Sequence, residues 1–367
     1  MPDVLAAKFA DQWHLIRAVS VLIILVMVTT YVTAQMVATG KAFSSFLGMG
    51  YETGVIVGSV IIIGYTFVGG YKAVSYTDVV QGVMMLLGLI AVPTAAIIAA
   101  GGVGEVRTSL MLQDPALLDL FAFGATPAWI GIASFLAIGL PFIGVPQLLI
   151  RYMSARDDGE IRKARIVSLV VLFVFTFGAV TAGVAGRALY PGLEDHETIF
   201  PVISNNLFPP VISGMLLVVV LSAIMSTVDS LLLLASSSAV RDTYQRIMGS
   251  DESDERLSSY GKAVTIVIGV FAVVLGVQEP RVIFDFVLAS WSGLGSAFGP
   301  AMIGILYYRH VTWLGVLSGI LGGFAASVVW LMFFKEAAHG LYEAIPGFAA
   351  GLVLTFGVSR LTRKKNA

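Results

Sequence analysis

The chain has 367 residues, of which 57% are hydrophobic and 12% charged, and its mean hydropathy is +0.90. Soluble domains of this length do not need so apolar a composition, whereas proteins that cross a bilayer many times do. The net charge of −1 gives no reason to expect a nucleic-acid partner, and the absence of cysteine excludes disulfides and thiolate metal sites. The first fifteen residues have no apolar core, so no signal peptide is predicted.

Apolar runs near the ~20 residues needed to cross a bilayer recur ten times along the chain. We therefore predict one all-α polytopic transmembrane domain over residues 1–367, with no soluble domain. The predicted spans are Leu15–Phe43, Thr53–Tyr71, Asp78–Ala100, Pro127–Met153, Ile166–Tyr190, Pro210–Ser238, Tyr260–Val277, Val282–Tyr308, Thr312–Phe334 and Leu341–Leu361. The longest predicted connections are Gly101–Thr126, Pro191–Pro209 and Val240–Ser259.

The distribution of Lys and Arg predicts the orientation of these spans, because basic residues concentrate in cytoplasmic loops. With the N-terminus of the chain in the cytoplasm, all but five of the 22 basic residues fall in cytoplasmic segments. The five on the other side are Lys41, Arg107, Arg187, Arg281 and Lys335. We therefore expect a multi-pass protein of the cell membrane whose chain has both ends in the cytoplasm.

Polar residues stand out at several points along the early spans. Tyr31 and Gln35 lie in the first span, where a tyrosine either packs between helices with its hydroxyl bonded or faces a binding site. Asp78 opens the third span, a position that the helix dipole favours for an acid in any case. From the residues alone, Tyr31 is either a packing residue or a binding residue, and Asp78 is either an ordinary helix-start acid or a functional one.

Two glycines and two prolines interrupt the fourth span, at Gly139, Pro141, Gly144 and Pro146. Such a helix is either kinked for packing or truly broken, and broken helices carry the binding sites of transporters near the bilayer midplane. Composition alone does not separate these two interpretations.

The sixth span carries small oxygen-bearing residues inside an apolar run, and residues 222–230 read SAIMSTVDS. Ala223, Ser226 and Thr227 are spaced i, i+3 and i+4, so they share one helix face. The Ala223 carbonyl points toward the two hydroxyls, and three uncharged oxygens suit a hard cation such as sodium. The alternative is that the hydroxyls bond back to main-chain carbonyls or pack as small residues between helices. A lone acid in this helix, Asp229, is costly and marks an ion or substrate path.

These segments resemble the sodium:solute symporter family. The resemblance extends over nearly the whole chain and in family order: residues 65–81 (YTFVGGYKAVSYTDVVQ), the sixth-span block 222–230 with the serines at 236–238, residues 297–300 (AFGP) and residues 341–348 (LYEAIPGF). It implies a leucine-transporter-type bundle built from a five-helix inverted repeat. It also implies a secondary active transporter that couples sodium influx to uptake of a small amino-acid-like or carboxylate solute by alternating access. The expected partners are sodium, that solute and the lipid bilayer.

The resemblance also assigns site residues. Sodium, the coupling ion, is expected at Ala223, Ser226 and Thr227. A second sodium site, or a proton in place of the second ion, is implied around Asp78, Asp229 and Ser230. The residues expected near the solute are Tyr31, Gln35, Ile138, Phe142, Pro146, Trp291 and Ser292. For Trp291 and Ser292, in the eighth span, a place at the external gate is one interpretation, and the alternatives are an interfacial tryptophan and a small packing residue.

The fourth span departs from proline-transporting members of the family. Ile138 and Phe142 stand where those members place a tryptophan and a tyrosine, although Pro146 matches. We therefore predict that proline is not the best substrate. The alternatives to a transporter are a membrane sensor domain of the same fold, a non-transporting fragment and an intramembrane enzyme. The spans contain none of the zincin, nucleophile-elbow or His-carboxylate patterns of an enzyme, so no enzymatic activity is expected.

The resemblance begins where family members have already passed their third membrane helix. Those members usually have thirteen spans, and ten are predicted in this chain. We therefore expect a domain that is incomplete at its N-terminus and lacks the broken first core helix, which supplies further sodium ligands. The expectation is that the full-length parent performs coupled transport and this exact chain does not.

Overall fold

The computed structural model describes residues 2–9, 14–68, 71–278 and 283–363 of the chain. Within these ranges the regular elements are helices, with no strand, which confirms the predicted all-α class. Gly69 and Gly70 of the family-like segment lie outside the described residues, as does Arg281.

Eight helices are long and apolar enough to cross a membrane. Each coincides with a predicted span, because hydropathy is a local property of the sequence. They are α2 (Leu15–Leu47), α4 (Tyr71–Ala99), α8 (Asp158–Leu189), α10 (Pro210–Ser237) with its continuation η4 (Ser238–Ile247), α11 (Asp254–Gln278), α12 (Ile283–Tyr307), α13 (Trp313–Val329) with η5 (Trp330–Phe334), and α14 (Ala344–Thr362).

The fourth predicted span is broken. It consists of α6 (Ala128–Ala137), the 3₁₀ turn η2 (Leu140–Ile143) and α7 (Pro146–Met153), and its two halves meet at 47°. Proline and glycine interrupt the helical hydrogen bonding there, so this structure confirms the broken alternative. Counted as one span, the bent pair raises the number of candidate spans to nine. The second predicted span is the shorter apolar helix α3 (Tyr51–Val68).

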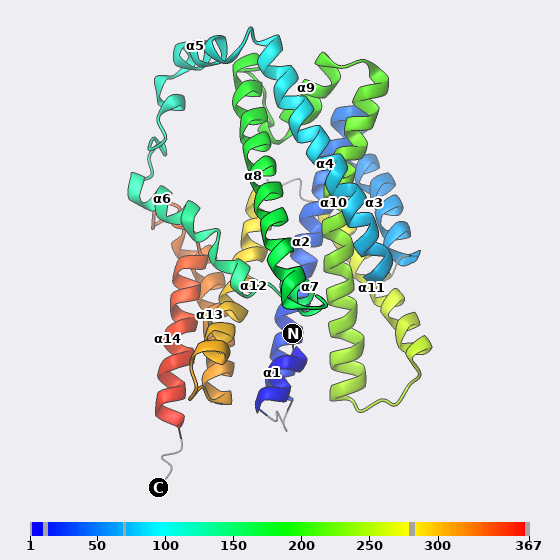
Figure 1. Ribbon diagram of the computed structural model, residues 1–367, viewed down its shortest axis with the longest axis vertical. Helices are drawn as coiled ribbons and strands as arrows, with labels where there is room; N and C mark the ends of the chain where they lie inside the picture. Colours follow the sequence, from blue (N-terminus) through cyan, green and yellow to red (C-terminus); the bar gives the residue numbers. More distant parts are fainter. Residues whose placement is uncertain (1, 10–13, 69–70, 279–282, 364–367) are drawn as a thin grey trace.

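Shorter helices lie outside these spans. The 3₁₀ turn η3 leads directly into α9, and both lie near the C-terminal end of α2 (Figure 1). The short helices are α1 (Pro2–Phe9), α5 (Val103–Gln113), η1 (Pro115–Leu118), η3 (His196–Thr198) and α9 (Ile199–Leu207).

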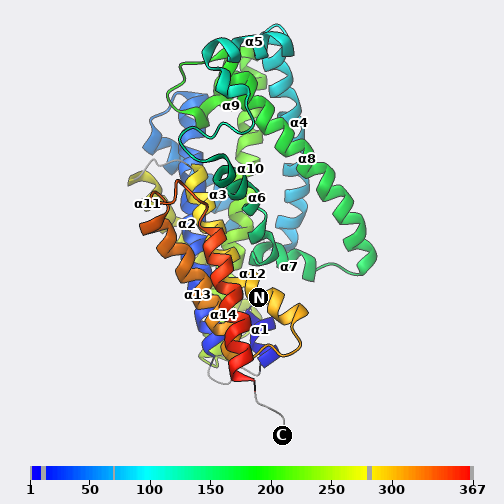
Figure 2. The same ribbon diagram turned by 90° about the vertical axis from the view of Figure 1, so that its left-hand side faces the viewer.

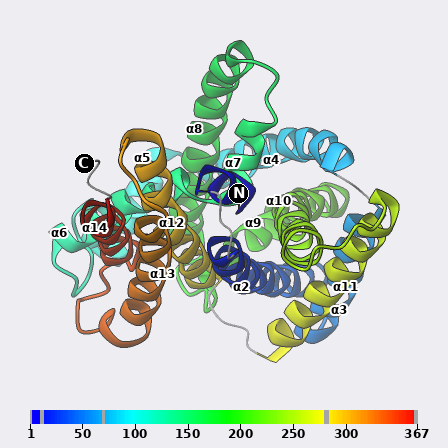
Figure 3. The same ribbon diagram turned by 90° about the horizontal axis from the view of Figure 1, so that it is seen from below.

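Helix α2 is the centre of the bundle. It packs against α3, α10 and α11 on one side and against α12 on the other, as the view from below shows (Figure 3). Ile24, Val28 and Val32 of α2 are fully buried, and they share one apolar core with Leu231 of α10 and Phe298 of α12. A helix that is apolar on all sides is stable in such a central position.

The outer helices contact fewer neighbours. Helix α8 packs along α4 and leans away from the rest of the bundle (Figure 2). Helices α13 and α14 pack tightly against each other and against α12. Most apolar side chains of α8 are exposed, including Val170 and Phe173, as expected of a surface that faces lipid.

One predicted connection is shorter than expected. Helix α10 continues without a break into η4, a π-helical segment, so that the chain is helical as far as Ile247 instead of leaving the helix at Val240. Arg17 of α2 fixes this end, since its guanidinium contacts Asp242 of η4 at 2.9 Å and Asp3 of α1 at 2.6 Å.

Candidate functional site

A cavity of about 230 Å³ lies where α2, α4, α7, α10 and α12 meet, and we call it the central cavity. Six of the residues predicted from the sequence line it, although they come from four different helices. They are Tyr31, Asp78, Ser226, Thr227, Ser230 and Trp291. The sequence therefore identified side chains that the fold brings to one place.

The two hydroxyls of α10 converge as their spacing predicts. The Ser226 hydroxyl donates to the Ala223 carbonyl at 3.1 Å, and the Thr227 hydroxyl donates to the same oxygen at 3.0 Å. Back-bonding of this kind is common for Ser and Thr in apolar helices. It also holds three oxygens within one ion's reach, and a hydroxyl can rotate its proton away to offer a lone pair to a cation.

Asp78 is paired with a cation from the broken span. The Arg151 guanidinium of α7 donates to Asp78 Oδ2 at 2.7 Å, and the same nitrogen donates to the Ser230 hydroxyl oxygen at 2.7 Å. The side chain of Arg151 is 50% exposed and that of Asp78 is 19% exposed. Asp78 Oδ1 is buried and has no hydrogen-bond partner within the described ranges. This arrangement places a positive charge against two residues of the predicted second sodium site.

Asp229 contacts a different helix. Its carboxylate is fully buried and accepts a hydrogen bond from the Thr66 hydroxyl of α3, while Oδ2 has no hydrogen-bond partner in the described part of the chain. In this conformation Asp229 faces α3, whereas Asp78 and Ser230 contact Arg151. The structure thus brings two of the three residues of the predicted second site together and holds the third against Thr66.

The broken span contacts α12 beside the central cavity. The Trp291 ring packs edge-on against Phe142, with ring centroids 5.0 Å apart, and its indole N–H donates to the Ile138 carbonyl at 3.2 Å. Pro146 is buried as the first residue of α7. A Cβ on Gly144 would lie 2.1 Å from the main-chain nitrogen of Gly299, so only glycine allows the two backbones to cross this closely.

A second cavity, of about 310 Å³, also contains residues of the sodium-site face, and we call it the outer cavity after the predicted outside position of Lys41, which lines it. Ala223, Thr227 and the predicted solute residue Gln35 line it, together with Lys41 and Glu197. Thr227 lines both cavities, so this hydroxyl lies between them.

Ser292 has a structural partner instead of a place in either cavity. It is fully buried, donates to Glu343 Oε1 at 3.2 Å and accepts from the Ser327 hydroxyl at 3.2 Å. Lys335 Nζ lies 3.1 Å from the other carboxylate oxygen of Glu343. These contacts join α12 to α13 and to the start of α14, which is the role of a small packing residue.

Two functional candidates on α7 were missed in the sequence. Gln147 and Arg151 are one turn apart and both line the central cavity. Gln147 Oε1 is buried without a hydrogen-bond partner among the described residues, so it is available to a ligand. Arg151 was counted only as a basic residue that sets orientation. The signal that was available is that both polar residues follow Pro146 inside a broken span.

Comparison with known proteins shows the family of the chain. The family model of the sodium:solute symporter family matches residues 1–323. The chain is 37% identical over 367 residues to the high-affinity proline transporter PutP of Bacillus subtilis, an alignment that covers 99% of this chain and 76% of the relative. It is 36% identical to a sodium/proline symporter of Staphylococcus aureus, covering 100% of this chain and 73% of the relative.

A solved structure shares the fold. It is the substrate-bound, outward-open state of a Na⁺-coupled sialic acid symporter, and its TM-score with this structure is 0.76 at 19% sequence identity. The superposition covers 98% of this chain and 76% of the symporter chain. The all-helical bundle is therefore of the leucine-transporter type, and the protein is a multi-pass membrane transporter, not an enzyme. The chain belongs to the sodium:solute symporter family, whose function is sodium-coupled transport of a small organic solute.

Proposed function

We propose that this protein couples sodium entry to uptake of a small amino acid across the cell membrane, with both ends of the chain in the cytoplasm. The observation that carries the proposal is the central cavity, which gathers Tyr31, Trp291, Asp78, Ser226 and Thr227. Each sodium ion that enters contributes ~2.3 kcal/mol per 100 mV of membrane potential, in addition to its concentration gradient.

The main sodium ion is proposed to bind at the Ala223 carbonyl and the Ser226 and Thr227 hydroxyls, whose convergence supports the site. A second ion, sodium or a proton, is proposed at Asp78 and Ser230. To bind sodium there, the Arg151 guanidinium must withdraw, because it occupies the same two oxygens. For Asp229 to join this site, its carboxylate must turn away from Thr66.

The solute is proposed to contact Tyr31 and Trp291 in the central cavity. Phe142, which packs against Trp291, is proposed to shape the broken span beside the cavity together with Ile138 and Pro146. Gln35 is proposed to act from the outer cavity, and Ser292 by holding α12 in place. The names of the two relatives support an amino acid. Ile138 and Phe142 offer no side-chain hydroxyl, so we keep the prediction that proline is not the best substrate.

Uptake into vesicles driven by an inward sodium gradient, with an inward potassium gradient as the reference, tests the proposal, and proline is compared against a panel of amino acids, carboxylates and sugars. The Ser226→Ala/Thr227→Ala protein should lose its sodium dependence while keeping its expression level. Ser222→Ala is the matched control, because that hydroxyl lies on the same helix but donates to the Val218 carbonyl and lines neither cavity. Unchanged sodium half-saturation in the double variant would show that the ion binds elsewhere.

A further inference from the structure

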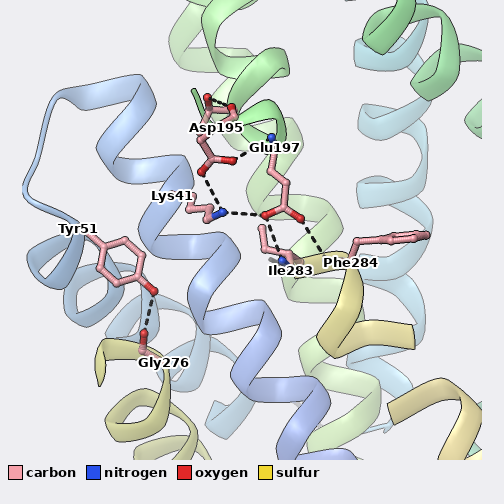
Figure 4. Close-up of polar contacts among 8 residues, drawn as sticks. Lys41, Tyr51, Asp195, Glu197, Gly276, Ile283 and Phe284 are labelled. Atoms are coloured by element: carbon pink, nitrogen blue, oxygen red, sulfur yellow. Dashed lines mark hydrogen bonds and ion pairs between the residues drawn. The ribbon is translucent and has the colours of Figure 1, made fainter. Parts of the chain in front are cut away.

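Glu197 joins three elements at the end of the outer cavity (Figure 4). Its Oε2 accepts from Lys41 Nζ of α2 at 2.7 Å and from the Ile283 N–H at 3.0 Å, and its Oε1 accepts from the Phe284 N–H at 3.1 Å. Ile283 and Phe284 are the first residues of α12. Both carboxylate oxygens are therefore engaged, and the side chain is only 20% exposed.

The hydrogen bonds that Glu197 accepts are of types that are stronger than bonds between neutral groups. The first N–H groups of a helix lack intrahelical acceptors and carry the positive end of the helix dipole, so a carboxylate is their preferred partner. The bond from Lys41 is charge-assisted as well. A further carboxylate supports the arrangement: Asp195 accepts from Lys41 Nζ at 2.9 Å and from the Glu197 N–H at 3.0 Å. Asp195 thus fixes the backbone from which Glu197 reaches α12.

We call these contacts of Glu197 and Asp195 with Lys41 and the first N–H groups of α12 the junction, and it borders the path to the proposed ion site. Lys41, Glu197 and Ile283 line the outer cavity, and so do Ala223 and Thr227. Trp291 of the central cavity lies eight residues along α12 from Ile283, which at 1.5 Å per residue is about 12 Å. Any shift of the α12 N-terminus relative to α2 therefore changes the width of the outer cavity and moves Trp291 against Phe142.

We propose that Glu197 is a positioning residue of the transport cycle, which holds the N-terminus of α12 against α2 and so keeps the outer cavity narrow. Solute and sodium gain wider access when this carboxylate releases α12. The inference rests on the proposed function, because it assumes that the outer cavity leads to the sodium site. The two carboxylates of the junction come from η3 and from Asp195 directly before it, and no direct side-chain contact with the transported solute is required of Glu197.

Cysteine labelling tests this directly, since the chain has no cysteine of its own. Ala38 lines the outer cavity and belongs to neither proposed binding site, so Ala38→Cys introduces a single reporter thiol. In purified protein, Glu197→Gln should raise the rate of its reaction with a polar maleimide about tenfold, the change that corresponds to ~1.4 kcal/mol. Lys41→Met should raise the labelling rate less, because Glu197 still accepts hydrogen bonds from the Ile283 and Phe284 N–H groups of α12. The melting temperature of each variant is measured as well. Faster labelling at an unchanged melting temperature indicates a loosened junction, whereas faster labelling that only accompanies a lower melting temperature indicates general unfolding.

Tyr51→Phe is the matched control. It removes the hydrogen bond from the Tyr51 hydroxyl to the Gly276 carbonyl, 2.7 Å long and near the junction, without touching α12 (Figure 4). Its labelling rate should equal that of the parent. Equal rates in the parent and the Glu197→Gln protein would overturn the proposal, and so would an equal rise in Tyr51→Phe. A sodium effect on labelling reports separately on the ion site: if sodium has none but Glu197→Gln still speeds labelling, the junction stands and the sodium assignment fails.

Discussion

Replacing Arg151 by glutamine should strengthen sodium binding at the proposed second site. The guanidinium donates to both Asp78 and Ser230, so it competes with an incoming ion for the same oxygens. Arg151→Gln removes the competing charge but keeps a polar side chain. The Asp78 carboxylate then has no counter-charge of its own in the central cavity, and sodium supplies it.

The size of the effect follows from the geometry. Two unit charges about 4 Å apart attract by ~4 kcal/mol at an effective dielectric constant of ~20, and by ~1 kcal/mol in bulk water. Arg151 is half exposed, so the value lies toward the lower figure, as for other solvent-exposed pairs. We take ~1–2 kcal/mol, which corresponds to a decrease of roughly 5-fold to 30-fold in the sodium concentration for half-saturation.

The assay is a sodium titration of melting temperature in the purified protein, with potassium in place of sodium as the reference salt. The Asp78→Asn/Arg151→Gln double variant completes a thermodynamic cycle. In the Asp78→Asn background, Arg151→Gln should leave sodium affinity unchanged, because no carboxylate remains to be released. A half-saturation that stays constant or rises in the single Arg151→Gln variant would refute the competition between guanidinium and ion.

Three further predictions concern stability. Gly144→Ala should destabilise the protein by ~1–3 kcal/mol or more, measured as a fall in melting temperature, because the added Cβ meets the Gly299 backbone; Gly214→Ala, with open space around it, is the control. Arg17→Met should cost ~3–5 kcal/mol, because it leaves Asp242 buried without its cation, and a melting temperature equal to the parent's would contradict this. Partial burial opposes ionisation of Asp3, but Arg17 and Arg241 outweigh this effect and hold the pKa of Asp3 below its usual value. Asp3 therefore stabilises the fold above pH ~4, and this contribution is lost as the pH falls through the lowered pKa. Asp3→Asn should therefore lose less stability than the parent on acidification.

The features that the sequence predicted well are those that local chemistry determines. Span positions follow hydropathy, and proline and glycine near Gly144 marked an interrupted helix, although composition left a kink and a full break as alternatives. The convergence of Ser226 and Thr227 on the Ala223 carbonyl is a property of one helix and its 3.6-residue turn. None of these needs knowledge of a neighbouring helix.

Contacts between distant segments could not be predicted, because they depend on neighbouring helices. Arg151 pairs with Asp78 across 73 residues, and Glu197 meets Ile283 across 86. Which basic residue faces which acid depends on how the helices pack, and no local pattern encodes it. Asp195 and Glu197 lie in a predicted connection, where acids are ordinary, so nothing in their surroundings distinguished them from solvated loop residues.

Asp78 and Asp229 provide a final test of the second sodium site. The resemblance to the sodium:solute symporter family implied that both residues share this site. In the structure, tertiary packing turns the Asp229 carboxylate to Thr66, whereas Asp78 lines the central cavity. Asp78→Asn should therefore weaken sodium binding more than Asp229→Asn, because only Asp78 presents its charge to the cavity as it stands. Sodium titrations of the two variants, with Thr66→Val as a control that frees Asp229 of its partner, compare them directly. A larger loss of affinity in Asp229→Asn than in Asp78→Asn would mean that Asp229 turns to the ion during binding, and that the site implied by the family resemblance describes the ion-bound state better than this conformation does.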